Sequence, residues 1–206
     1  MGARVQEWVD GRGCDTMLLR SSSSPALTAA GAWNRDLAGD ADRYAAAVDE
    51  WAAYFRAEGI EAIGYGTVVL RRRVSGEPWF RVIQLPETIA GQASEHLQRI
   101  FAGVDVANDP DETLAARVLA PAPDLRVRQT LAPRGGGWQI AGAELELERG
   151  IGFRAALDEQ TLRLLTAVDG TRTTGEVVGQ VAGSPDETTI GLDVVRGLLE
   201  LGVLEA

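Results

Sequence analysis

The hydrophobic pattern of this chain changes at Pro86, and that change constrains the fold more than any other feature. Before Pro86, short apolar runs at 14–20, 62–73 and 79–85 predict strands, and residues 40–58 predict one long helix ending at a glycine. Beyond Pro86, helical spacing of apolar residues becomes more frequent. Strands and helices are therefore both expected, which indicates an α+β protein.

Two details of the first stretch bear on its topology. Residues 62–73 and 79–85 are separated by a short turn with glycine and proline, so we expect them to pair as a hairpin. Residues 21–25 are polar and end in proline, which predicts a loop. The helix at 40–58 carries one broad apolar face, formed by Tyr44, Ala47, Val48, Trp51, Ala52, Tyr54 and Phe55.

The stretch after Pro86 mixes both periodicities. Residues 88–102 and 113–119 predict helices, whereas 125–131 and 138–148 alternate apolar and polar residues, as half-buried strands do. A glycine-rich turn separates these two strands, and residues 153–157 predict one more short strand.

The last fifty residues predict a small helical unit. Helices are expected from about 157 to 168, from 174 to 181 and from 184 to about 200, followed by a short apolar strand at Val203 and Leu204. Three helices and a strand are the pattern of a winged-helix unit. The expected organisation is thus residues 1–85, a mixed region at 86–156 and a winged-helix-like unit at 157–206.

Composition narrows the classes of partner. The chain has 206 residues, 45% of them hydrophobic, yet no apolar run is long enough for a membrane span, so no membrane partner is expected. A single cysteine, Cys14, excludes an intramolecular disulfide and indicates a cytoplasmic protein. The net charge is −10, and residues 151–206 carry four Arg against nine acidic residues. This acidic end argues against sequence-independent nucleic-acid binding there.

No catalytic, cofactor-binding or metal-binding residue is assigned from motifs. His96 is the only histidine and is expected on a helix surface or partly buried, while Cys14 is expected to be buried and inert. The glycine clusters at 64–66, 135–137 and 150–152 lack the spacing of a phosphate-binding loop.

The basic run Arg71, Arg72 and Arg73 has two interpretations. It is a weak candidate for contacting a nucleic-acid backbone. The alternative is a solvated strand end, where charge prevents unwanted pairing.

The order of motifs carries a resemblance. The segments WVDGRGCDTMLL, AGAWNRDL and YAAAVDEWAAYFRAEGIEAIGYGTVVLRR follow one another within residues 8–73. They resemble the last third of the catalytic domain in an actinobacterial family of class I S-adenosylmethionine-dependent methyltransferases, related to the small-domain and release-factor-type enzymes. The family's C-terminal region resembles residues 168–206. The fold implied is the remnant of a Rossmann-like sheet followed by a region ending in a winged-helix-like unit.

The resemblance also implies roles for particular residues. Its Trp-x-Arg-Asp segment corresponds to Trp33, Arg35 and Asp36, which we expect to bind substrate on the methyl-acceptor side. An aromatic plane beside an Arg–Asp pair would stack on and orient a planar group. The alternative is that Trp33 packs in the core beside a surface ion pair.

The elements that hold the cofactor in this family have no counterpart in the sequence. There is no glycine-rich loop after a first strand and no Asn-Pro-Pro-Tyr motif. We therefore expect a methyltransferase-like C-terminal fragment without stand-alone activity, which binds S-adenosylmethionine only if the missing half is supplied. The alternative is a binding module built on the winged-helix-like end, with a protein as partner in preference to nucleic acid.

The missing half predicts a partner for one strand. In the complete family sheet the seventh strand lies between the fifth and the sixth. Here the fifth strand is missing, so one edge of strand 62–71 is expected to need a cover. Three covers are weighed: residues 79–85, a second copy in a homodimer, or a complementing catalytic half.

Overall fold

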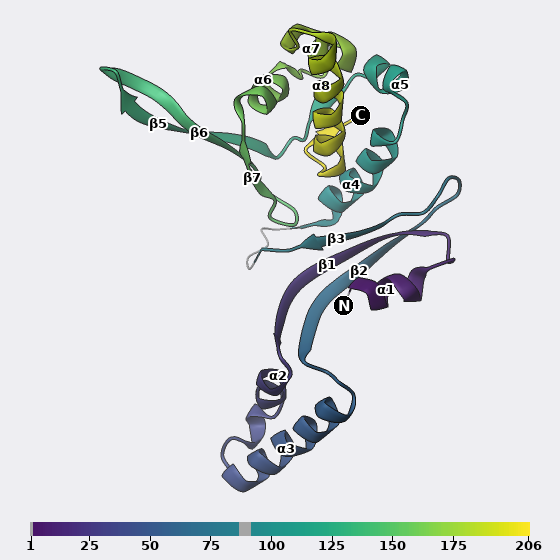
Figure 1. Cartoon of the computed structure of the whole chain (residues 1–206), viewed down its shortest axis with the longest axis vertical. Coiled ribbons are helices and arrows are strands. Elements are labelled where there is room, and N and C mark those ends of the chain that lie inside the picture. Colours follow the sequence, from purple (N-terminus) through teal and green to yellow (C-terminus); the bar gives the residue numbers. More distant parts are fainter. Residues whose placement is uncertain (1, 87–91) are drawn as a thin grey trace. The chain divides into compact units, whose positions relative to one another are not determined.

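The computed structural model describes residues 2–86 and 92–206, and the chain divides into two compact units, Met1–Glu87 and Thr88–Ala206. Both units combine helices with small sheets, so the expected α+β class is confirmed (Figure 1). The first unit contains α1 (Gly2–Val9), β1 (Cys14–Pro25), α2 (Ala26–Trp33), η1 (Arg35–Leu37), α3 (Ala41–Ala57), β2 (Ala62–Arg72) and β3 (Phe80–Gln84).

The sheet of the first unit has the order β2-β1-β3. β2 pairs with β1 antiparallel, and β3 pairs with the other side of β1 in parallel, over Thr16–Arg20. The expected hairpin of 62–73 with 79–85 is therefore wrong. The physical reason is that β1 offers two edges, and the turn after β2 carries the chain across its end to the second one.

β1 is longer than the apolar run that predicts it. Ser22–Pro25 continue as strand and pair with residues 62–65 of β2, with a register shift after Arg20. The loop expected at 21–25 is therefore wrong, because cross-strand pairing with β2 outweighs the weak strand preference of serine. Beyond Arg20, β1 and β2 form a two-stranded ribbon that ends at α2 and α3 (Figure 1).

α3 begins and ends where the sequence predicts. Asp40 caps it by accepting a hydrogen bond from the Arg43 backbone N–H at 3.1 Å, and Gly59 with φ of 62° follows its last turn. Of its broad apolar face, only Phe55 is buried. Phe55 packs with Ala26 and Ala30 of α2, while the rest of the face is half-buried or, at Trp51 and Tyr54, exposed.

The second unit contains five helices and five strands within residues 92–206. They are α4 (Ser94–Ala107), α5 (Asp111–Ala116), β4 (Ala120–Pro121), β5 (Leu125–Arg134), β6 (Gly137–Leu147), β7 (Arg154–Leu157), α6 (Glu159–Ala167), α7 (Thr174–Val181), α8 (Pro185–Glu200) and β8 (Leu204–Glu205). The first residues of the helix expected at 88–102 lie outside the described part, and α4 begins at Ser94.

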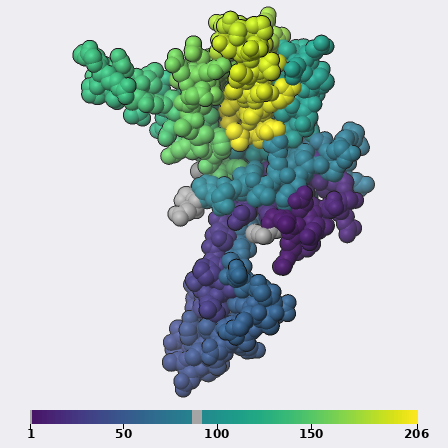
Figure 2. Space-filling model, viewed as in Figure 1, coloured from purple at the N-terminus to yellow at the C-terminus, as the bar shows by residue number. Residues whose placement is uncertain are grey.

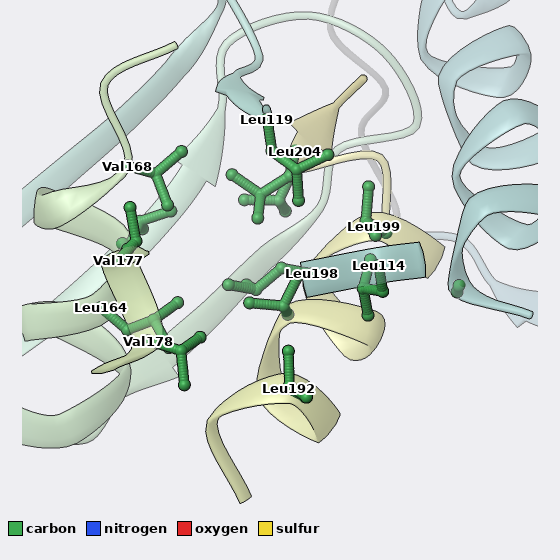
Figure 3. Packing of buried hydrophobic residues seen from close by; sticks show 14 of the residues in the cluster. Leu114, Leu119, Leu164, Val168, Val177, Val178, Leu192, Leu198, Leu199 and Leu204 are labelled. Atoms are coloured by element: carbon green, nitrogen blue, oxygen red, sulfur yellow. The ribbon is translucent and has the colours of Figure 1, made fainter. Parts of the chain in front are cut away.

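Side chains from before and after residue 157 share one core in this unit. Leu114 of α5 and Leu145 of β6 are buried together with leucines and valines of α6, α7, α8 and β8 (Figure 3). Gly103 of α4 allows a close approach, because a Cβ there would lie 2.0 Å from the Leu199 carbonyl oxygen of α8. The three-part division at 86 and 157 stays a prediction.

The β5–β6 hairpin stands out from the rest of the second unit (Figures 1 and 2). Its two faces differ in chemistry. One face pairs Arg126 with Glu146 and Arg128 with Glu144. The other face is apolar and runs from Leu145, which is buried, to Trp138, which is 72% exposed. The apolar face therefore continues the core into solvent.

Candidate functional site

Asp15 of β1 is a buried carboxylate that organises one end of the first sheet. Arg71 of β2 donates to its Oδ2 from Nε at 3.0 Å and from Nη2 at 2.5 Å, and Arg73 donates to Oδ1 at 2.8 Å. The Trp79 backbone N–H also donates to Oδ1, at 3.3 Å. Burial alone would raise the pKa of Asp15, but these hydrogen bonds from Arg71, Arg73 and Trp79 lower it below its usual value.

This arrangement gives Arg71 and Arg73 a structural role in the sheet. Both guanidinium groups contact the same carboxylate, which directly links β1 to β2 and to the segment entering β3. Arg72 between them is exposed. The basic run therefore presents less free positive charge than its sequence suggests, because two of its three side chains neutralise Asp15.

The strongest candidate site is an aromatic cluster, which we define as Trp33, Trp51, Tyr54, Phe55 and Tyr65. Three of these rings come from α3, at the i, i+3 and i+4 spacing that places side chains on one helix face. Trp33 ends α2 and Tyr65 lies on β2. All except Phe55 are at least 36% exposed, so the cluster forms a surface with Phe55 at its base.

Trp51 is at the centre of this cluster. Trp33 meets it edge to face with ring centroids 5.2 Å apart, and Tyr54 meets it at 6.0 Å with an interplanar angle of 80°. Phe55 stacks on Trp51 at 5.4 Å. Contacts with three rings set the orientation of the indole while it remains 36% exposed.

Trp33 is placed by both packing and a hydrogen bond. Its Nε1–H donates to the Tyr65 hydroxyl at 3.1 Å, and its ring is 43% exposed. The alternative that Trp33 packs in the core is therefore wrong, because the buried cluster between α2 and α3 consists of Ala26, Ala30 and Phe55 and leaves Trp33 at its edge. Arg35 and Asp36 lie on η1, where Arg35 donates to the Ala32 carbonyl at 3.2 Å. No ion pair joins Arg35 to Asp36 in the part of the chain described.

A pocket of about 420 Å³ opens beside these rings, lined by Glu50, Trp51 and Tyr54. Glu50 is exposed and precedes Tyr54 by one helical turn, so the two side chains lie on the same flank of α3. Within residues 2–86 and 92–206, no ion pair engages Glu50. The pocket thus combines aromatic surface with one carboxylate, a set of groups suited to a cationic ligand.

Sequence reasoning identified only Trp33 of this site. Trp51, Tyr54 and Phe55 were not expected there, because an apolar face at helical spacing more often packs inward than outward, and neither Glu50 nor Tyr65 carries a local signal for a site. The available signal was the aromatic spacing on α3 next to acidic residues. Residues 34–61 contain seven carboxylates against three Arg.

The second unit holds the only histidine, His96, in a structural position. The ring is 1% exposed, its Nε2–H donates to the Leu201 carbonyl at 2.8 Å, and its Nδ1 accepts from the Ile151 N–H at 3.4 Å. Burial lowers the pKa of His96 below its usual value. The expectation of a surface or partly buried histidine is wrong, because Gly150 and Gly202 let the backbone close around the ring.

A larger pocket of about 530 Å³ lies beside α4, and Arg99 is the cation in its lining. Arg99 donates to Asp124 at 2.8 Å and to the Gly202 carbonyl at 3.1 Å. This guanidinium serves the packing of α4 on the end of the chain, which leaves the aromatic cluster as the better candidate for a ligand.

Cys14, expected to be buried, is partly exposed, and its Sγ lies 3.5 Å from the Arg12 carbonyl.

None of the helices described is both long and apolar enough to cross a membrane. Neither the family models nor the curated proteins compared with this chain give a match.

Proposed function

We propose that this chain is the C-terminal portion of a class I S-adenosylmethionine-dependent methyltransferase, with no methyltransferase activity by itself. The observation that carries the proposal is the position of β2. It runs antiparallel to β1 along one edge, and within the described residues no strand pairs with its other edge. An antiparallel strand with one vacant side is what remains of the family's sheet when the fifth strand is supplied from elsewhere.

The lack of stand-alone activity follows from what methyl transfer requires. The cofactor and the acceptor must be held together in near-attack geometry. The sequence contains no glycine-rich cofactor loop and no Asn-Pro-Pro-Tyr motif, so S-adenosylmethionine has no recognisable binding elements here. Methylation would therefore depend on a cofactor-binding half outside this sequence. As a separate point, we propose that the protein is cytoplasmic.

The vacant edge of β2 also determines which partners fit. β3 pairs with β1 and does not cover β2, so the free edge of β2 is left for a complementing half or a second copy. An antiparallel pair of two β2 strands centred on Thr67 sets Arg72 opposite Ala62 of the other copy.

The acceptor side is assigned to Trp33, Arg35 and Asp36. Support comes from the exposed Trp33 ring and from η1, which presents Asp36 to solvent directly after it. With a complementing half present, these residues would orient a planar acceptor group by stacking and hydrogen bonding.

Calorimetric titration tests the proposal. We expect S-adenosylmethionine to give no binding heat with the purified chain at micromolar concentrations. The positive control is a longer polypeptide that includes the residues encoded upstream in the same frame, for which micromolar binding is expected. Micromolar binding by the chain itself would contradict the proposal.

A second candidate function is a protein-binding module formed by the helical end. The supporting observations are the order α6-α7-α8-β8, with β8 paired to β4, and the projecting β5–β6 hairpin. The outer side of α8 carries Asp186, Glu187 and Asp193, all exposed, which disfavours a phosphate backbone and favours a protein partner. DNA or RNA binding that weakens steeply with salt would contradict this choice of partner.

A further inference from the structure

We propose that the pocket beside α3 binds an organic cation of the quaternary ammonium type. The pocket is the one lined by Glu50, Trp51 and Tyr54, with a volume of about 420 Å³. This inference does not rest on the methyltransferase proposal, because it follows from the rings, the carboxylate and the charge of the helix alone.

The rings of Trp51 and Tyr54 offer a surface that attracts cations. Trp51 and Tyr54 stand nearly perpendicular, at 80°, and both border the pocket. The face of an aromatic ring carries partial negative charge, and tryptophan attracts cations most strongly. Trp51 is 36% exposed and Tyr54 is 51% exposed, so ring surface is available to a ligand.

Glu50 supplies a negative charge next to these rings. Glu50 belongs to the pocket lining, and none of the ion pairs among the described residues includes its carboxylate. The surrounding segment 34–61 is acidic, with seven carboxylates against three Arg. An anionic ligand would be repelled here, whereas a cation would gain from both the carboxylate and the longer-range field.

The chemical class follows from hydration. A primary ammonium is compact and strongly hydrated, so moving it onto an aromatic surface is costly. A quaternary ammonium has apolar methyl groups around its charge and makes both apolar and cation–π contacts with the rings. The pocket volume also falls within the usual range for small-molecule sites, about 300–1,000 Å³.

The pocket is held in place before any ligand binds. Phe55 is 4% exposed and stacks under Trp51, while the Trp33 hydrogen bond to Tyr65 ties the cluster to β2. Asp40 caps the start of the same helix. A preformed site loses less conformational entropy on binding, so a small ligand retains more of its interaction energy.

The decisive comparison is between choline and its uncharged isostere 3,3-dimethylbutan-1-ol, titrated into the full chain and followed by the NMR signals of the tryptophan indole N–H groups. We expect choline to shift the Trp51 and Trp33 signals. We also expect it to bind at least about tenfold more tightly than the isostere, because the neutral molecule makes neither the cation–π contacts with the rings nor the charge interaction with Glu50. The Trp138 signal on the β5–β6 hairpin is the internal control and should not move.

Two variants locate the effect. Glu50→Gln should weaken choline binding about two- to fivefold and leave the isostere unchanged, since it removes only the charge. Asp49→Asn is the matched control, because Asp49 neighbours Glu50 but does not line the pocket. Trp51→Leu should abolish the preference for choline. If this variant does not fold, the comparison of choline binding by Glu50→Gln and by Asp49→Asn still tests the proposal.

A third arm identifies the source of the cation. A short peptide with trimethyllysine is compared with the same peptide containing lysine, and both are compared with free choline. Discrimination between the two peptides by about tenfold supports a quaternary ammonium site. Equal binding of choline and its isostere, or equal loss in the Glu50 and Asp49 variants, would overturn the proposal and indicate an apolar protein-docking surface instead.

Discussion

The two units differ in how completely they bury their large side chains. In the second unit, residues of five helices and short strands close around Leu199, which has no exposed surface (Figure 3). In the first unit, Trp51 sits at the centre of the aromatic cluster and still is 36% exposed. The second unit therefore has a closed core apart from its projecting β5–β6 hairpin, whereas the first unit keeps the aromatic cluster and a strand edge open.

The difference shows that different forces hold the two units. Apolar burial dominates in the second unit, because its core residues come from almost every element. In the first unit, apolar burial on the sheet is concentrated at Met17 and Leu18 of β1, and strand pairing and the Asp15 contacts with Arg71 and Arg73 add to it, while β2 is exposed along most of its length. Open surface of this kind is available to partners and ligands.

Leu199→Ala should have the largest effect on stability, because it removes a side chain from the centre of the closed core. Truncating a fully buried leucine leaves a cavity that neighbouring helices cannot fill, so we expect the second unit to lose about 3–5 kcal/mol of stability. Hydrogen exchange of the α8 amides in the native protein measures this loss. Exchange in β1 should be unchanged, and an equal loss there would show that the units are not independent.

Asp15→Ala should produce the next largest effect, in the first unit. The change removes the buried carboxylate that accepts hydrogen bonds from two guanidinium groups, and we expect a loss of about 2–3 kcal/mol. Urea unfolding followed at β1 and β3 amides measures it. Asp36→Ala is the control, since Asp36 is exposed, and a comparable loss from that variant would count against the role of Asp15.

Thr67→Lys tests the open edge of β2. If two copies pair there, the introduced ammonium groups lie opposite each other, and we expect dissociation to become at least about tenfold easier. Sedimentation over a range of concentrations measures this. Thr130→Lys on the exposed hairpin is the control. A wild-type chain that stays monomeric at high concentration, with fast amide exchange in β2, would exclude the homodimer.

A smaller effect depends on pH and on His96. Burial lowers the folded-state pKa of His96, so the unfolded chain binds the proton more readily. The stability of the second unit should therefore be constant above about pH 6.5, the unfolded value, and should fall as the pH decreases below it. Unfolding measured from pH 7.5 to 5 tests this. In His96→Gln the decrease in stability below about pH 6.5 should be absent, whatever the variant's stability at pH 7.

Trp138→Ser should have the smallest effect on folding. The ring is 72% exposed at the end of the hairpin, so its removal should change stability by no more than about 0.5 kcal/mol. Thermal unfolding measures this. A loss of 2 kcal/mol would mean that the apolar face of the hairpin is covered in the folded protein.

Local sequence determines the identity and ends of most elements in both units. Thr173 and Glu176 form the capping box that begins α7, and Ser184 caps α8 through a hydrogen bond to the Glu187 N–H. The alternation at 125–131 and 138–148 predicts the paired strands β5 and β6. These features depend on neighbours a few residues away, which is why they can be read from the chain itself.

Only the tertiary structure decided which strand pairs with which and which faces stay open. The order β2-β1-β3 replaces the expected hairpin, because pairing depends on which edge is reached after the turn and not on strand propensity. The same holds for Asp15, whose two Arg partners lie far along the chain, and for His96, which is buried by distant glycines. The apolar face of α3 fits helical periodicity whether buried or exposed, so only the limited packing of α2 against it leaves Trp51 at the surface.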